Sequence, residues 1–418
     1  MTRACLLLVL LLPACHRGQD TAGIADAMAS ASPVEAAAPA PAVLPARCHP
    51  AGSGVAIASP EELELGDEVA LDDGYAVSLV HRTPAGRMMG VALVDRDVTA
   101  ARVVDLAVTL GDASPPHLLR RGKELLVAGQ AVTKSGSTRE LAVLALDASG
   151  AARPLATIPQ QRDDSLAFDL GAGLVVWDEA TAGLAPRGVI RVAELGGDHG
   201  GAPHDVSPPE SDAEMPRLAA DGAGAFVLWV ARRPEPAVAL DAGLPAAAEA
   251  VGEARTNSWL EGVTVDAAGI PSGPVRRLTP ASGHVSAYDV QALAGPGRPS
   301  LLVVARDDGE AVDGSGGSLL RVRLREDGVD PPLGLPGDGL GRGAPSLVDG
   351  PLPWLAWIGP HEELRLLPLD AAGGPVGPPS AEPLLDDALP LAMLGGTRLL
   401  AAFPGDAVAP LRLFTCDR

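Results

Sequence analysis

The segment FVLWVA at residues 226–231 decides the fold, because it is one of several short apolar runs that recur along the chain. The other runs are YAVSLV from Tyr75, LLVAGQ from Leu125, LVVWDE from Leu174, LLVVAR from Leu301, WLAWIG from Trp354 and LLAAFP from Leu399. Five of the six separations between successive starts lie between 45 and 53 residues, and the sixth contains an insertion. A fixed period of this length indicates a repeat architecture.

Each apolar run has the same kind of neighbours. A short run that ends in a turn precedes it, as in VALDDG (69–74), and an alternating strand follows it, as in RELAVLALD (139–147). A hairpin signal comes next, such as DASG (147–150), and a last short strand closes the unit, as in ARPLATI (152–158). Asp and Gly supply the backbone conformations that such turns need. The repeating unit therefore has four strands.

Seven units of four strands resemble the blades of a β-propeller. We therefore predict an all-β, seven-bladed β-propeller of four-stranded antiparallel blades. A six- or eight-bladed ring, a β-helix and a pair of sandwiches are the alternatives. The blades lack the WD dipeptide, the kelch double glycine and a DxDxDG calcium loop, so the resemblance is architectural and names no functional family. Trp177, Trp229 and Trp357 recur at one place in their units, which favours packing between blades over a ligand cage.

The last unit lacks its fourth strand. The segment GVAIASP (54–60) is left over at the front of the repeats and resembles that strand, so we predict that it completes the last blade and closes the ring. Cys48 precedes this segment, and Cys416 ends the third strand of the last blade. Antiparallel pairing would bring the two cysteines together, and an exported protein usually oxidises such a pair. A Cys48–Cys416 disulfide is expected, with two free thiols as the alternative.

The N-terminus, MTRACLLLVLLLPAC, has a basic residue, a short apolar run and then small residues, as secretory signals do. Residues 12–15, Leu-Pro-Ala-Cys, resemble the lipobox of bacterial lipoproteins, in which the cysteine carries acyl chains. The resemblance implies a signal peptide at 1–14, lipidation at Cys15 and, since His16 follows, the outer membrane of a Gram-negative cell. A plain signal peptide cut elsewhere is the alternative. The Ala/Pro-rich residues 15–47 are expected to form a tether, and residues 48–418 the propeller.

The formal net charge is −21. An acidic surface repels nucleic acid, so we expect no nucleic-acid partner. We expect the lipid anchor to contact the membrane. We also expect the protein to be a monomer and its partner to be an envelope protein or a glycan.

Loops between the second and third strands share one face of a propeller, and they are longer in blades two to five. The longest is an insertion at about 233–258 in the fourth blade. Elaborated loops on a rigid scaffold commonly bind ligands. The residues that we assign to this candidate binding face are Asp178, Glu179, Arg187, Arg232, Arg233, Asp307 and Asp308.

Two clusters have ligand types that metals prefer. Asp307, Asp308 and Asp313 could bind calcium, and the pair His199 and His204 could bind zinc. The aspartate spacing does not match an established calcium loop, and the histidine pair has no identifiable third ligand. We therefore expect no cofactor, with Ca²⁺ as the alternative.

The chain carries no recognisable nucleophile motif or phosphate loop. The leading hypothesis is a noncatalytic binding or scaffold module. A propeller-type polysaccharide hydrolase or lyase is the alternative, and an outer-membrane assembly factor is a further one. An acid pair converging in the central channel would favour the enzyme.

Overall fold

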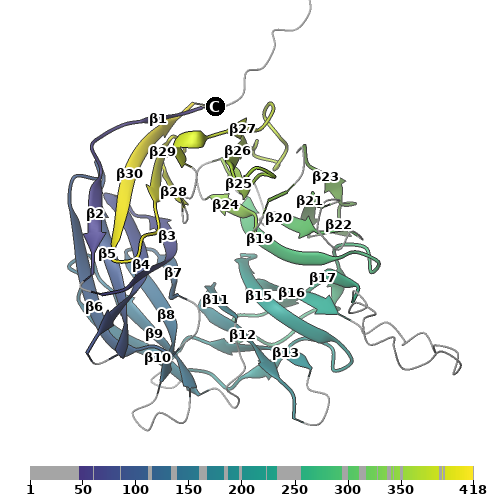
Figure 1. Cartoon of the computed structure of the whole chain (residues 1–418). Coiled ribbons are helices and arrows are strands. Elements are labelled where there is room, and N and C mark those ends of the chain that lie inside the picture. The colour runs from purple at the N-terminus through teal and green to yellow at the C-terminus, as the bar shows by residue number, and fades with distance from the viewer. Residues whose placement is uncertain are drawn as a thin grey trace, which may run out of the picture. The chain divides into compact units, whose positions relative to one another are not determined.

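The chain from Cys48 to Cys416 forms a seven-bladed β-propeller, in which seven antiparallel sheets surround a central channel (Figure 1). The computed structural model describes residues 47–417, except 60, 85, 112–114, 133–138, 160–166, 183–186, 197–199, 223, 233–255, 294–299, 310–316, 327, 337–339, 342, 349–351, 386–387 and 389–390. Among the described residues no helix is long and apolar enough to cross a membrane.

The first four blades follow one another in chain order, each running from the channel outward. Blade 1 consists of β3 (Leu63–Ala70), β4 (Gly74–Thr83), β5 (Gly86–Asp95) and β6 (Ala101–Thr109). Blade 2 consists of β7 (His117–Arg121), β8 (Glu124–Val132), β9 (Arg139–Leu146) and β10 (Ala152–Pro159). Blade 3 consists of β11 (Phe168–Gly171), β12 (Leu174–Ala180), β13 (Gly188–Glu194) and β14 (His204–Asp205). Blade 4 consists of β15 (Asp212–Ala220), β16 (Ala225–Arg232), β17 (Ser258–Val265) and β18 (Arg276–Arg277).

The last three blades include two with divided outer strands. Blade 5 consists of β19 (Val285–Leu293), β20 (Ser300–Asp307), β21 (Ser318–Arg325) and the pieces β22 (Gly328–Val329) and β23 (Leu333–Gly334). Blade 6 consists of β24 (Ser346–Val348), β25 (Trp354–Ile358), β26 (Leu364–Pro368) and β27 (Ser380–Ala381), followed by the 3₁₀ helix η1 (Pro383–Leu385). Blade 7 consists of β28 (Leu391–Leu394), β29 (Arg398–Ala402), β30 (Val408–Cys416) and the N-terminal pieces β1 (Cys48–Pro50) and β2 (Val55–Ala58).

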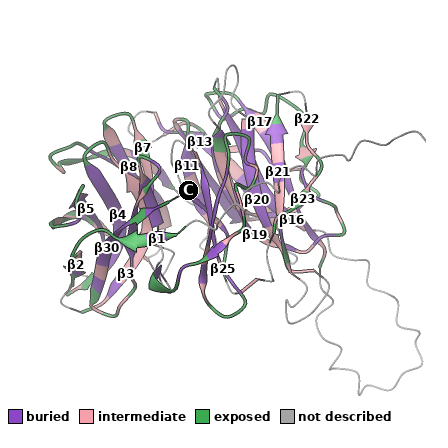
Figure 2. Cartoon of the chain, turned by 90° about the horizontal axis from the view of Figure 1, so that it is seen from above, coloured by how far each residue is buried: buried purple, intermediate pink, exposed green. Residues whose placement is uncertain are grey.

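The seven apolar runs of the sequence are the seven second strands, as predicted. In β16 all residues from Ala225 to Ala231 are buried, because both faces of the strand pack against neighbouring blades. Figure 2 shows buried residues along the strands and exposed residues at the turns. Trp177, Trp229 and Trp357 are 1%, 0% and 4% exposed and belong to clusters that join adjacent blades, which confirms their packing role.

The outer strands of blades 3 to 6 are shorter than the sequence pattern suggests. The strands β14, β18 and β27 each have two residues, and blade 5 divides its outer strand into two pieces. Their segments contain prolines and glycines, as in the run DPPLGLPG at 330–337. Proline cannot donate a ladder hydrogen bond, so a continuous outer strand does not form there. Such interruption also protects the sheet edge from pairing with another chain.

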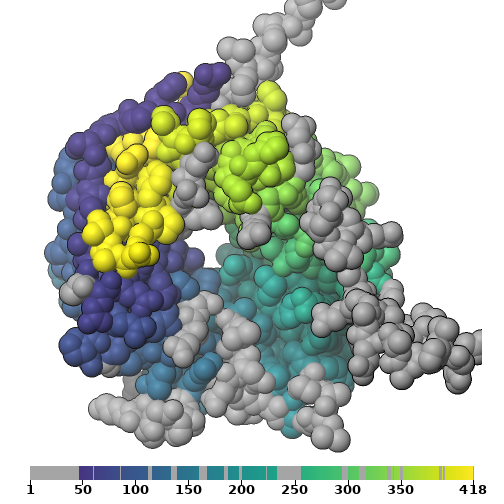
Figure 3. All heavy atoms as spheres, viewed as in Figure 1, coloured from purple at the N-terminus to yellow at the C-terminus, as the bar shows by residue number. Residues whose placement is uncertain are grey.

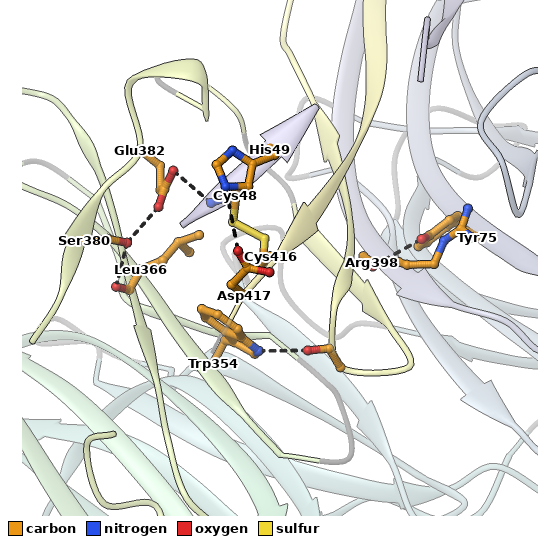
Figure 4. Close-up of a disulfide and its surroundings, with 11 residues drawn as sticks. Cys48, His49, Tyr75, Trp354, Leu366, Ser380, Glu382, Arg398, Cys416 and Asp417 are labelled. Carbon is orange, nitrogen blue, oxygen red and sulfur yellow. Dashed lines mark hydrogen bonds and ion pairs between the residues drawn. A yellow bond between two sulfur atoms is a disulfide. The ribbon is translucent and has the colours of Figure 1, made fainter. Parts of the chain in front are cut away.

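The ring closes as predicted, by an N-terminal strand in the last blade. Both β1 and β2 pair with β30, and Cys48 lies opposite Cys416, to which it is joined by a disulfide with a Cα–Cα distance of 4.0 Å (Figure 4). The break between the two pieces ends at Gly54, whose φ is +74°. A Cβ there would lie 2.5 Å from the Leu411 carbonyl oxygen, so only glycine lets the two strands approach.

Side chains from blade 6 hold the closing strand in place (Figure 4). The backbone N–H of Cys48 donates to Oε2 of the buried Glu382 at 3.3 Å, and Ser380 Oγ donates to Oε1 of the same carboxylate at 2.9 Å. Trp354 Nε1 donates to the carbonyl of Gly396 at 3.3 Å. The sheet that contains β1 and β30 is therefore tied to its neighbour by hydrogen bonds as well as by packing.

Candidate functional site in the central channel

A cavity of about 350 Å³ lies in the channel, beside the first halves of the innermost strands, and both apolar and polar side chains line it. Figure 3 shows the opening at the centre of the ring. Residues from six blades line the cavity: Leu65, Gly66, Asp67, Pro115, His117, Ala167, Phe168, Met215, Pro216, Arg217, Tyr288 and Ala344. The volume lies within the range of about 300–1,000 Å³ that is typical of small-molecule sites.

An aspartate and a histidine form a pair on one wall of the cavity. Nδ1 of His117 lies 2.9 Å from Oδ2 of Asp67, and the imidazole ring packs edge-on against Phe168 with 4.6 Å between the ring centroids. Burial alone would lower the pKa of His117, but the Asp67 carboxylate raises that pKa above its ordinary value. Burial would raise the pKa of Asp67, and the attraction of His117 holds it below its ordinary value. Each side chain of the pair therefore favours the charged form of the other.

Three aspartates join neighbouring blades around the channel. Asp67 accepts a hydrogen bond from the backbone N–H of Leu118 at 3.1 Å, Asp169 from Leu218 at 2.8 Å, and Asp289 from Leu347 at 2.6 Å. These bonds connect blade 1 to 2, blade 3 to 4 and blade 5 to 6. We call these three carboxylates the aspartate staples. Their first task is structural, because each carboxylate accepts a backbone donor of the next blade.

Arg217 enters the cavity from a β-bulge in β15. The register of β15 against β16 shifts between Glu214 and Arg217, so Met215 and Pro216 together oppose one residue of β16. Met215 has a φ of +55°, which is a strained conformation for a side chain of its size. Bulges of this kind commonly reorient a side chain next to a functional site.

Neighbouring blades fix the bulge from both sides. The backbone N–H of Met215 donates to Oδ2 of Asp178 in blade 3 at 3.0 Å. The hydroxyl of Tyr288 in blade 5 donates to the carbonyl oxygen of Met215 at 2.8 Å. Strain at one residue persists only where its surroundings determine its conformation, and these two bonds supply that support.

Nearby carboxylates attract Arg217, but the hydrogen-bond donors of its guanidinium have no partner among the described residues. The attraction of Asp169 and Asp289 raises its pKa against the effect of burial. Within the described part of the chain, no carboxylate forms an ion pair with Arg217 at 4.0 Å or less, and its guanidinium donates no hydrogen bond. Burial raises the pKa of Asp289 to about 6 and that of Asp169 above its ordinary value, although Arg217 opposes both shifts.

A second bulge, in β3, places Asp67. The register of β3 against β4 shifts between Leu65 and Glu68. A Cβ on Gly66 would lie 2.3 Å from Ser78 Oγ and 2.6 Å from the Pro116 carbonyl oxygen, so glycine is required for this close approach. The two bulges face the same cavity.

The described residues of the candidate binding face mostly form contacts within the propeller. Glu179 is 3% exposed and pairs with Arg191 at 2.7 Å, Arg232 pairs with Glu214, and Asp308 pairs with Arg306 at 2.6 Å. Asp307 accepts the backbone N–H groups of His284 and Gly309 at 3.2 and 2.9 Å. The backbone N–H of Arg187 donates to Thr181 Oγ1 at 3.0 Å, and the residue is exposed. Asp178 does not line the cavity itself, but it accepts the backbone N–H of Met215, which does.

Some predicted residues lie outside the described part of the chain. These residues are Cys15, His199, Arg233 and Asp313. His204 lies in β14, opposite Val192. Among the described residues, no group of three or more His, Cys, Asp or Glu side chains is placed to hold a metal ion.

The innermost strands carry a residue pattern that alternates from blade to blade. This pattern is not visible when the repeats are aligned on their second strands. When the copies are aligned on their innermost strands, blades 1, 3 and 5 carry the staple aspartates. Blades 2, 4 and 6 carry a proline, one variable residue and a leucine, as Pro116-His117-Leu118, Pro216-Arg217-Leu218 and Pro345-Ser346-Leu347. The leucine N–H receives the staple, and the variable residue is His117 or Arg217 in two of the three cases.

No known protein family matches the chain, and no curated protein matches it in sequence. Several solved structures resemble it in fold. Puromycin hydrolase is 18% identical with a TM-score of 0.51, over 82% of this chain and 51% of that one. The β-propeller domain of the Trilobed protease from Pyrococcus furiosus is 10% identical with a TM-score of 0.49, over 85% and 96%. The acylaminoacyl peptidase of Pyrococcus horikoshii is 10% identical with a TM-score of 0.48, over 84% and 51%.

The chain spans about half the length of puromycin hydrolase and of the acylaminoacyl peptidase. At these identities the likeness shows the propeller fold and nothing about activity.

Proposed function

We propose that this protein is a lipid-anchored β-propeller of the cell envelope, which binds a polar ligand in its central channel without changing it chemically. The observation that carries this proposal is the convergence of polar side chains from four blades on one cavity of about 350 Å³. The cavity combines a mostly apolar lining with a few positioned polar groups, which is the usual composition of a ligand site. The signal and lipobox resemblance at Cys15 support export and anchoring at the outer membrane.

The orientation of the propeller is compatible with this function. The cavity lies near the starts of the innermost strands, and the connections between second and third strands lie at the same ends of the blades. Cys48, which directly follows the predicted tether, lies at the opposite ends, beside Cys416. A ligand that enters on the loop side therefore approaches from the face opposite the attachment point.

The channel hypothesis can be tested by filling the cavity. Ala344 lines the cavity and is exposed, so an Ala344→Trp substitution is expected to block ligand entry while the protein stays folded. Ala268→Trp is the matched control, because Ala268 is exposed in a hairpin between β17 and β18. Purified full-length protein would be tested for capture of envelope glycans and peptides. Equal capture by both variants and the wild type would contradict a channel site.

A deletion of residues 233–254 separates the channel from the loop face that the sequence suggested. If this deletion abolishes capture and Ala344→Trp does not, the loops bind the partner. Lipidation has its own test, since Cys15→Ser should abolish incorporation of labelled palmitate and release the protein from the membrane fraction.

The second candidate function is a glycan hydrolase or lyase, favoured by the Asp67–His117 pair. A histidine that a carboxylate orients within a ligand cavity has the arrangement of a general acid or base. The enzyme hypothesis predicts new reducing ends or unsaturated sugars when the protein is incubated with envelope polysaccharides. It also predicts that His117→Gln abolishes this turnover while binding persists. Binding without any product supports the noncatalytic proposal.

A further inference from the structure

We propose that Arg217 binds the carboxylate of a sugar acid in the channel, which makes the ligand of the site a uronate rather than a neutral sugar. This inference rests on the proposed channel function and names its ligand class. It follows from three properties of the cavity: which hydrogen-bonding groups are already engaged, how Arg217 is held, and what else lines the wall.

The first property is the unequal use of donors and acceptors. Both carboxylate oxygens of Asp169 accept backbone N–H groups, from Leu170 and Leu218, and both oxygens of Asp289 do the same. Arg217, by contrast, makes no hydrogen bond from its guanidinium to any described residue, although it lines the cavity. A guanidinium has five N–H donors in a fork that matches a carboxylate. Among these three described side chains, the unused hydrogen-bonding capacity therefore belongs to the cationic donor Arg217.

The second property is the rigid support of Arg217. The bulge that carries it is held by Asp178 from blade 3 and by Tyr288 from blade 5, at 3.0 and 2.8 Å. A strained, doubly supported bulge is unnecessary for packing a blade, since β7 and β11 line the same channel without one. Rigid placement lowers the entropy cost of binding, as expected for a residue that recognises a ligand.

The third property explains why the ligand is a sugar acid with one carboxylate. The Asp67 carboxylate is 42% exposed, and a carboxylate oxygen can accept more than one hydrogen bond, so it can accept ligand hydroxyls. Phe168 and Tyr288 belong to the same wall but are only 1% and 3% exposed, so they limit the size of the cavity rather than offer an open aromatic face. The staple aspartates and the net charge of −21 repel a polyanion. A hydroxylated ring with a single carboxylate satisfies all three conditions, and the cavity is larger than a bare carboxylate needs.

The test compares three small probes on the full-length protein by calorimetry and saturation-transfer NMR. D-glucuronate carries the carboxylate, D-glucuronamide has the same shape without the charge, and acetate has the charge without the ring. A charge-assisted bidentate contact predicts that glucuronate binds about tenfold or more tightly than glucuronamide. Acetate is expected to bind more weakly than glucuronate, because it lacks the hydroxylated ring.

Variants assign the effect to Arg217. Arg217→Gln is expected to reduce glucuronate affinity to that of glucuronamide and to leave glucuronamide binding unchanged. Arg217→Lys retains the charge but loses the fork, so it should fall between the two. Arg232→Gln is the matched control, because Arg232 pairs with Glu214 and does not line the cavity. Circular dichroism and thermal melting would verify that each variant is folded, and the wild-type comparison of probes needs no variant at all.

The outcomes separate this inference from the proposed function. Equal affinity for glucuronate and glucuronamide, or a glucuronate affinity that Arg217→Gln does not change, overturns the uronate assignment. The channel function then stands if Ala344→Trp still abolishes binding. Acetate binding as tight as that of glucuronate would show that any carboxylate suffices, which also overturns the assignment. Binding that Ala344→Trp leaves intact lies outside the channel and overturns both.

Discussion

Removing the Cys48–Cys416 disulfide is expected to lower the free energy of unfolding by about 4 kcal/mol. The bond closes a loop with a sequence separation of 368 residues. The chain-entropy relation gives about 6 kcal/mol for a loop of this length, which is an upper value because real denatured chains are more compact than the relation assumes. The measured losses for native disulfides are commonly about 2–5 kcal/mol.

The assay is thermal unfolding of the double variant Cys48→Ala/Cys416→Ala, in which alanine avoids burying an unpaired hydroxyl. An unfolding entropy of about 2.1 cal/mol/K per residue over 368 residues predicts that 4 kcal/mol lowers Tm by about 5 °C. Each single variant should match the double, because either one removes the same bond. A Tm within about 1 °C of the wild type, or single effects that add up, would refute the view that this bond closes the ring.

Three further predictions concern the channel and the core. Asp289 has a folded pKa of about 6, above its ordinary 3.8. Its contribution to stability is therefore greatest below pH 4 and is lost as the pH rises through 6. Urea unfolding at pH 5 and pH 7.5 should show this loss in the wild type and a smaller loss in Asp289→Asn. Trp229→Ala should cost about 3–5 kcal/mol in chemical denaturation, since the side chain is fully buried between blades. Gly66→Ala should cost about 1–3 kcal/mol and weaken ligand binding, whereas Gly273→Ala, which has no atom within 4 Å of its Cβ, should change neither by a measurable amount.

The architecture was predictable because it depends on a strong, repeated signal. A second strand that packs on both faces must be apolar at every position, so seven copies such as FVLWVA are visible despite divergent loops. The ring closure was also predictable. The spare strand at residues 54–60 could complete only the last blade, and Cys48 and Cys416 were left to pair with each other. The outer strands were less predictable, since two residues of pairing, as in β18, leave almost no pattern.

The channel site could not be predicted from single segments. Asp67, His117 and Arg217 are separated by 50 and 100 residues, and only ring closure brings their blades to one cavity. The alternation of staple aspartates with Pro-X-Leu segments is a sequence signal, but it is visible only after the innermost strands are aligned. Arg217 additionally depends on a register shift in β15, which no composition or periodicity specifies.

The position of the disulfide also determines how the propeller bears a mechanical load. A pull on the residues before Cys48 would otherwise detach β1 from the edge of its sheet one hydrogen bond at a time. The covalent bond instead transmits that force to Cys416 at the end of β30, which is paired on both sides. To yield, the blade must then separate β30 from β29 and from β2. If the proposed lipid anchor holds the protein at its N-terminus, the propeller would thus resist unravelling from the point at which it is attached.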